Sequence, residues 1–228
     1  MTGASAMSPA GSARGWLLVL DTATNTIVVA AGRPDGSLLA ANAFEGRYRH
    51  SQELLPAVQR LLAGANLQLS DLAGVLVGTG PGAFTGLRVG LATAKTLAHE
   101  LQVPVVGITT SEALLAAGAG ERLWLPSGPR DRLLIEVGTA PRVVHDGGAD
   151  LPGDVAIDLA GRAEAAALER GRAAVEALAG SLLRMGGARL AAGEFDDPER
   201  LVPAYAVPPR GAPATEPEGG VAWSRDPR

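Results

Sequence analysis

Hydrophobic residues near the start of the chain fall into three runs of strand length. The first is Trp16–Asp21, the second is the β-branched run Thr26–Ala31, and the third is Ser37–Ala43. Arg33-Pro34-Asp35-Gly36 separates the last two; proline presets φ there and glycine accepts a positive φ. Short turns between consecutive strands predict an antiparallel meander.

A helical period follows the meander. Between His50 and Leu62 the apolar residues recur at a spacing of three and four, which predicts a helix with one apolar stripe. The expected elements after it are, in order, strand Gly74–Val77, helix Leu87–Leu101, strand Val103–Ile108 and helix Ser111–Ala117. Three antiparallel strands followed by helix, strand, helix and strand is the order of a ribonuclease-H-like or actin-like lobe with a mixed sheet.

The second half has a weaker pattern. We expect strands at Arg122–Leu125, Arg132–Val137, Val143-Val144 and Val155–Leu159, two helices at Ala163–Arg170 and Ala173–Met185, and a closing extended segment over 201–210. Gly186-Gly187 is expected to end the second helix. The predicted organisation is a first lobe over 16–108 and a second lobe over 109–210. Disordered segments are expected over 1–15 and 211–228, and the true start is left open between Met1 and Met7.

The turn between Val77 and the next helix is rich in glycine and is the first candidate site. Gly78, Gly80, Gly82 and Gly86 let the backbone approach another group closely, and the helix N-terminus presents free N–H groups. An anion or a nucleotide phosphate would suit this geometry, with Gly80, Gly82, Thr85 and Arg88 as contacts. The alternative is that the glycines only permit close packing of strand and helix. No Gly-Lys-Ser/Thr follows, so the turn is not a Walker loop.

Asp21, Thr22 and Thr24 follow the first strand and form a second candidate. In actin-like ATPases an acid at this position holds magnesium, and hydroxyl groups contact phosphate. The alternative, which we favour, is that Asp21 and Thr22 satisfy backbone donors at the end of the strand.

Composition narrows the classes of function. The chain has no cysteine, which excludes disulfides, thiol nucleophiles and thiolate metal sites and fits a cytoplasmic protein. Its net charge of −4 disfavours binding of a nucleic acid by the chain alone. No apolar run approaches the length of a membrane span.

Four segments together carry a family resemblance. They are Leu20-Asp21-Thr22-Ala23-Thr24, His50-Ser51 with Leu54-Leu55-Pro56, Gly80 to Gly90 with Ala94-Lys95 and Leu97-Ala98, and the closing Pro203-x-Tyr205. In this order they resemble the TsaB (YeaZ) family of tRNA threonylcarbamoyladenosine synthesis. The resemblance is close from Trp16 to Leu115. The strand of the type Asp-Ala-Arg-Arg that often opens the second lobe in this family is replaced here by Leu123 to Arg132.

This resemblance implies an ASKHA fold and a non-catalytic scaffold subunit. The expected partners are a TsaD-like catalytic subunit and a TsaE-like ATPase, with tRNA reached indirectly through the complex and a homodimer as the form in isolation. No membrane partner is expected, and ATP or ADP with magnesium is expected only at the level of the complex. The expected partner interface is the first-lobe helix pair, through Leu54, Leu55, Val58, Leu61, Leu62, Val89, Ala92 and Leu97.

Two catalytic alternatives remain beside the scaffold. One is a stand-alone ATPase or kinase of the ASKHA class that uses Asp21. The other is a peptidase, for which the chain has no short histidine pair, no cysteine and no recognisable Ser–His–Asp signature. The catalytic relatives carry His-x-x-x-His where this chain has Gly107–Leu114, a segment without histidine. We therefore expect no metal site and no catalytic residue.

Overall fold

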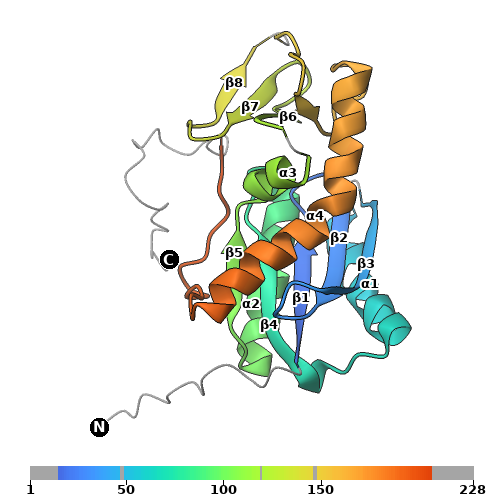
Figure 1. Cartoon of the computed structure of the whole chain (residues 1–228), viewed down its shortest axis with the longest axis vertical. Coiled ribbons are helices and arrows are strands. Elements are labelled where there is room, and N and C mark those ends of the chain that lie inside the picture. The colour runs from blue at the N-terminus through green and yellow to red at the C-terminus, as the bar shows by residue number, and fades with distance from the viewer. Residues whose placement is uncertain (1–14, 47–48, 119, 146–147, 207–228) are drawn as a thin grey trace, which may run out of the picture.

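The first lobe is built on a five-stranded sheet of order β3-β2-β1-β4-β5, seen in a computed structural model that describes residues 15–46, 49–118, 120–145 and 148–206 (Figure 1). β1 (Trp16–Asp21), β2 (Thr26–Gly32) and β3 (Leu38–Glu45) form the antiparallel meander. β4 (Leu72–Gly78) lies parallel to β1, and β5 (Val105–Ile108) parallel to β4. The predicted antiparallel meander and the mixed sheet of the first lobe are confirmed.

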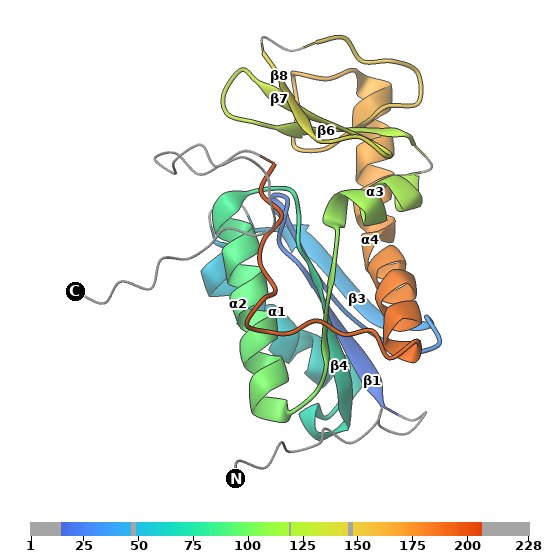
Figure 2. The same ribbon diagram turned by 90° about the vertical axis from the view of Figure 1, so that its left-hand side faces the viewer.

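Helices cover both faces of this sheet. α1 (His50–Ala65) and α2 (Phe84–Leu101) lie on one face; α3 (Thr110–Gly118) and α4 (Ala165–Ala191) lie on the other (Figures 1 and 2). A short 3-10 turn, η1 (Leu69–Asp71), precedes β4. Alternate residues of β1 enter the two cores: Leu18 and Leu20 pack on the side of α1 and α2, and Leu17 and Val19 on the side of α4. A strand buried on both faces needs an uninterrupted apolar run, which is what the sequence shows.

The second lobe repeats this plan with fewer elements. β6 (Arg122–Pro126), β7 (Arg132–Glu136) and β8 (Arg142–Val144) form another antiparallel meander, and β9 (Val155–Ala156) lies parallel to β6. The order β8-β7-β6-β9 matches β3-β2-β1-β4 of the first sheet. The expected α/β class, with two lobes and mixed sheets, is confirmed.

The prediction of two helices in the second half is wrong. One helix, α4, runs over all 27 residues from Ala165 to Ala191, and Gly186 and Gly187 lie inside it. A Cβ on Gly186 would come within 2.7 Å of the Leu76 side chain on β4, so this glycine lets the helix lie directly on the sheet. The glycines therefore serve helix–sheet packing rather than helix termination.

The same helix holds the two lobes together. Near its start a Cβ on Gly171 would lie 1.9 Å from the backbone oxygen of Ala156 on β9, whereas its C-terminal half packs on the first sheet. A hydrogen bond of 2.7 Å from the Asn25 N–H to the Asp158 carboxylate also joins the lobes. The boundary at 108/109 stays a prediction, and α4, which follows it, contributes to both cores.

The expected disordered segments fall almost wholly outside the described residues, as does the closing segment from residue 207 onward. Within the described ranges, none of the helices combines the length and apolar character that crossing a membrane requires.

The close approach of α4 to β9 predicts a difference between two glycines of the same helix. Gly171→Ala places a methyl group against backbone that cannot yield, and we expect a destabilisation of about 1–3 kcal/mol. At Gly180 the only neighbouring atom within 4 Å of a Cβ is Arg184 Nη1, 3.7 Å away, so Gly180→Ala should stabilise by up to about 1 kcal/mol. Urea unfolding of both variants measures this, and equal effects would contradict the packing described.

Candidate functional site: the Asp21 turn and the start of α2

The Asp21 carboxyl group is the central polar group of the second candidate site. It is fully buried at the end of β1, where Oδ1 accepts from the Ala23 N–H at 2.9 Å and Oδ2 accepts from the Thr110 hydroxyl at 2.7 Å. The Thr110 hydroxyl oxygen accepts in turn from the Gly80 N–H at 3.0 Å. Asp21 thus joins the end of β1, the turn after β4 and the first turn of α3.

Burial also changes the acidity of Asp21. Removal of the carboxylate from water raises its pKa from 3.8 to about 6, although the bonds from Thr110 and Ala23 and the charge of His50 oppose this rise. Gly78 makes room for the group, because a Cβ there would lie 1.7 Å from Oδ2.

The two threonines of this turn point into the protein. The Thr22 hydroxyl donates to the Gly86 carbonyl at 2.8 Å, and the Thr24 hydroxyl bonds to Thr26 of the same turn. Both side chains are buried. Asp21, Thr22 and Thr24 therefore satisfy groups of the β1–β2 turn and of α2, and this favours the structural alternative for them.

The β1–β2 turn packs against glycines that lie on α2 and just before it. A Cβ on Gly82 would lie 2.1 Å from the Ala23 carbonyl oxygen, one on Gly86 2.1 Å from the Thr22 carbonyl oxygen, and one on Gly90 2.2 Å from the Thr22 hydroxyl. The Ala83 N–H, at the start of α2, donates to the Ala23 carbonyl at 2.7 Å. The β1–β2 turn therefore occupies the space beside these glycines that a phosphate would need.

Three of the predicted anion contacts remain at the surface. Gly82, Thr85 and Arg88 are exposed at the N-terminal end of α2, whereas Gly80 is buried beneath Leu87 and Ala204. The structure thus divides the predicted contact set into a buried part around Asp21 and an exposed part on the first turn of α2.

Phe84 lies outside the core although it is a large aromatic residue at the start of α2. Its side chain is 39% exposed and stacks on Tyr205, with ring centroids 5.1 Å apart, and the Arg88 guanidinium lies 4.6 Å from its centroid. Tyr205 belongs to the closing segment, which runs along α2 (Figure 2) and donates from the Ala204 N–H to the Thr79 carbonyl. Lys95 of α2 holds the same segment through the Leu201 carbonyl at 3.0 Å.

The predicted interface residues lie at different depths. Leu54, Val58 and Leu61 are buried in the monomer's own core; Leu62, Val89 and Leu97 are partly buried; Leu55, at 51% exposed, and Ala92 face outward. Of the predicted interface residues, only Leu55 and Ala92 are therefore fully outward, with the edges of the partly buried side chains beside them.

The three histidines are far apart in the fold. His50 is buried with Nε2 3.0 Å from the Thr24 carbonyl, and it does not cap its helix, which has no side-chain cap. His145 lies at the surface beside Asp131, and His99 is exposed near the end of α2. Across the described ranges, histidine, aspartate and glutamate form no group of three placed to hold a metal ion.

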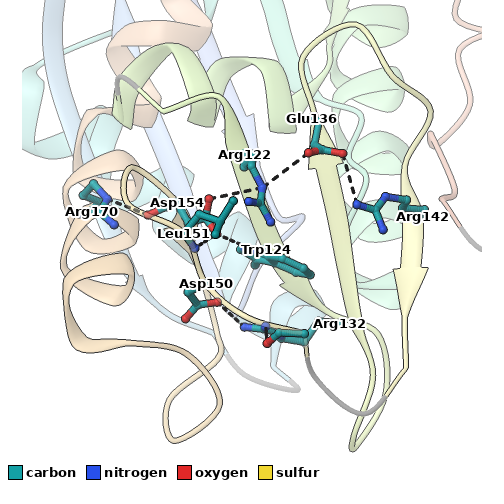
Figure 3. A network of polar contacts seen from close by, with 10 residues as sticks. Arg122, Trp124, Arg132, Glu136, Arg142, Asp150, Leu151, Asp154 and Arg170 are labelled. Carbon is teal, nitrogen blue, oxygen red and sulfur yellow. Dashed lines mark hydrogen bonds and ion pairs between the residues drawn. The ribbon is translucent and has the colours of Figure 1, made fainter.

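A polar network in the second lobe was missed by the sequence analysis (Figure 3). Trp124 lies between two guanidinium groups, Arg132 at 4.2 Å and Arg122 at 5.4 Å from its ring, and its indole N–H donates to Asp154 at 2.7 Å. Arg132 is fully buried and pairs with Asp150 at 2.6 Å. The only signal in the sequence was an arginine within an otherwise apolar strand pattern. A charged side chain is buried in such a strand only when another group pairs with it.

Comparison with known proteins places the chain in a family. The family profile "TsaD: tRNA N6-adenosine threonylcarbamoyltransferase" matches residues 45–158, half of the chain. The TsaB protein of Bacillus subtilis is 35% identical over 102 residues, which are 45% of this chain and 44% of that protein. The TsaB protein of Escherichia coli is 37% identical over 94 residues, 41% of this chain and 40% of that protein. The chain thus spans less than half the length of these two relatives.

Comparison with solved structures supports the same two-lobe fold. The structure of YeaZ from Pseudomonas aeruginosa superposes with a TM-score of 0.62 at 24% identity, covering 84% of this chain and 99% of that one. This chain has the features of the ASKHA class: two lobes with mixed sheets, and an acid at the end of the first strand. The chain belongs to the TsaB/YeaZ family.

The raised pKa of Asp21 predicts how stability depends on pH. Because the folded state binds this proton more tightly than the unfolded state, stability should fall by up to about 3 kcal/mol as the pH rises from about 4 to about 6, and then level off. Asp21→Asn should abolish this contribution of Asp21 to the pH dependence. Urea unfolding at pH 4.5 and pH 7 measures it: the free energy of unfolding should change less between the two pH values in the variant than in the wild type.

Asp35 provides the matched control for this measurement. Bonds from the Ser37 hydroxyl and N–H lower the pKa of this exposed carboxyl, so Asp35→Asn should change the pH dependence in the opposite sense. Parallel stability curves for the wild type and Asp21→Asn would contradict the raised pKa.

Proposed function

We propose that this chain is a non-catalytic subunit of the machinery that forms N6-threonylcarbamoyladenosine next to the anticodon of tRNA. Its partner in the proposal is a TsaD-like catalytic subunit, with a TsaE-like ATPase in the same complex. The observation that carries the proposal is membership of the TsaB/YeaZ family, through a profile match that covers α1, β4, α2 and β5.

The surroundings of Asp21 and the lack of a histidine pair favour a non-catalytic role. Asp21, the acid that a stand-alone ATPase would need, is sealed between Thr110, Ala23 and Gly78, so a magnesium ion would not reach it without opening of the turn. The segment Gly107–Leu114 has no histidine pair of the kind that binds metal in the catalytic relatives. ATP or ADP with magnesium enters the proposal only at the complex, where a partner would complete a site beside Gly82, Thr85 and Arg88.

The proposed docking surface for the catalytic subunit is the outer face of α1 and α2. Leu55 on α1 and the small Ala92 on α2 are exposed, and a small residue permits close contact with a helix of another chain. The same face would serve a homodimer when the partner is absent. A net charge of −4 supports indirect contact with tRNA, and the proposed location is the cytoplasm.

The test of the proposal is reconstitution of tRNA threonylcarbamoylation. TsaD-like, TsaE-like and threonylcarbamoyl-AMP-forming proteins are assayed with this chain omitted and then added, and the chain alone is assayed for ATP hydrolysis with magnesium. Activity that requires the chain, without hydrolysis by the chain alone, is the expected result. Hydrolysis by the chain alone with no effect on the mixture would favour the ATPase alternative.

The proposed interface predicts a loss of partner binding in Leu55→Glu. Because Leu55 is half exposed in the monomer, the variant should fold, and a buried charge at the interface should weaken TsaD-like partner binding at least ten-fold. Leu151→Glu is the matched control, since Leu151 is also 51% exposed but lies in the second lobe. Val58→Glu does not serve as a test, because Val58 is buried and its change would unfold α1.

The measurement is a pull-down with the catalytic subunit together with a circular-dichroism melt of each variant. Retained binding by folded Leu55→Glu, or equal loss in Leu151→Glu, would exclude the outer helix face as the docking surface.

A further inference from the structure

A groove of about 420 Å³ lies where the two lobes meet beside α4. One wall is the end of β3, the second is the stretch that follows β9, and the third is the first half of α4. The lining is largely apolar and includes Phe44, Ile157, Leu159, Leu168 and Val175. Among the described residues, none from α1, α2 or the Asp21 turn lines it, so the groove is distinct from the candidate site described above.

The rim of this groove is acidic. Glu45, Asp158 and Glu176 border it, against one cation, Arg172, which pairs with Glu169 on the same helix. Within the described ranges, neither Glu45 nor Glu176 takes part in an ion pair, and both are exposed. An apolar lining beneath a negative rim suits an occupant with an apolar body and a positive group. A volume of this size is in the range of pockets that hold such a ligand.

The chain itself contains a segment of this chemistry, outside the described residues. Val221, Trp223 and Arg225 stand at alternate positions, and Trp223 is the only aromatic residue from 207 onward. Because side chains alternate in direction along an extended chain, these three share one side, and Asp226 belongs to the other. The first side therefore carries two apolar groups followed by a cation, which complements an apolar lining with an acidic rim.

The chain is long enough to bring this segment to the groove. Ala206, the last described residue before it, packs against the core. The seventeen residues 207–223 span up to about 56 Å when extended, whereas a folded body of about 190 residues is roughly 40 Å across. Four prolines between 208 and 217 disfavour a helix in this linker, which would shorten its reach.

We propose that the groove binds the chain's own segment 221–225, with Trp223 against the apolar lining and Arg225 at the acidic rim. These five residues are then an exception to the disorder expected over 211–228. Because the groove takes its walls from both lobes, the docked segment adds contacts between the lobes to those that α4 makes. The groove lies apart from α1 and α2, so this docking is independent of the proposed tRNA function.

The absence of cysteine makes a cross-linking test available in the full-length chain. Arg225→Cys is combined in turn with Glu45→Cys and with Glu176→Cys, and at least one pair should form an intramolecular disulfide on mild oxidation. Arg225→Cys with Leu55→Cys is the matched control, because Leu55 is also exposed but lies on α1, and it should react at least five-fold more slowly.

Two outcomes of the cross-linking overturn the docking. Rates equal to the control in both rim pairs would show that the segment does not reside at the groove. A disulfide that joins two copies, in place of one within a single chain, would assign the groove to the segment of another molecule. Mobility under non-reducing conditions separates the two products.

A fluorescein-labelled peptide of residues 217–228 tests recognition without a covalent bond. Full-length Trp223→Ala leaves the groove open and should bind this peptide about ten-fold more tightly than the wild type, whose own segment competes at high effective concentration. Fluorescence anisotropy measures both affinities. Equal affinity of the two proteins, or binding by neither, overturns the proposal.

Charge reversal then tests the rim in the same open-groove background. Glu45→Lys and Glu176→Lys together should weaken peptide binding at least five-fold, and a peptide that carries Arg225→Glu should recover it. The matched control makes the same change in net charge at the exposed Glu100 and Glu199, which lie away from the groove. An equal loss in the control, or no recovery with the reversed peptide, overturns the assignment of Arg225 to the rim.

Discussion

The fold depends on the contact between the β1–β2 turn and the glycine-bearing side of α2. Gly86 and Gly90 lie four residues apart on one side of α2, and Gly82 lies just before the helix; together they admit the backbone of Thr22 and Ala23 and the Thr22 hydroxyl. This contact sets how closely α2 lies on the sheet, and with it the position of α1 beside α2. A methyl group at any of the three positions would meet backbone or the Thr22 hydroxyl at about 2 Å.

Asp21 extends this contact to the opposite face of the sheet. Its carboxyl group reaches Thr110 at the start of α3, and Thr110 receives the Gly80 N–H of the turn before α2. The same position that would hold a cation in a nucleotide-hydrolysing relative therefore serves here as a buried hydrogen-bond junction. Because burial alone raises the pKa of Asp21, the junction is most stable when this group carries its proton.

The second lobe adds a buried polar network to its apolar packing. Its small sheet places Trp124 between Arg122 and Arg132; the Asp154 carboxylate accepts from the Trp124 indole N–H, and the Asp150 carboxylate pairs with Arg132. α4 then joins this lobe to the first sheet along its length.

The sequence by itself determined the elements of the first lobe, because its inner strands are uninterrupted apolar runs, its helices carry a period of 3.6 residues and its turns carry proline and glycine. It also suggested the family, and it correctly offered close packing as an alternative for the glycine-rich turn. Tertiary structure decided what periodicity cannot show: that Gly186 and Gly187 continue α4, that Phe84 lies outside, and that Arg132 is buried. The physical reason is common to all three. A glycine, an aromatic ring or an arginine takes its role from the group it meets across the fold, and local sequence does not specify that group.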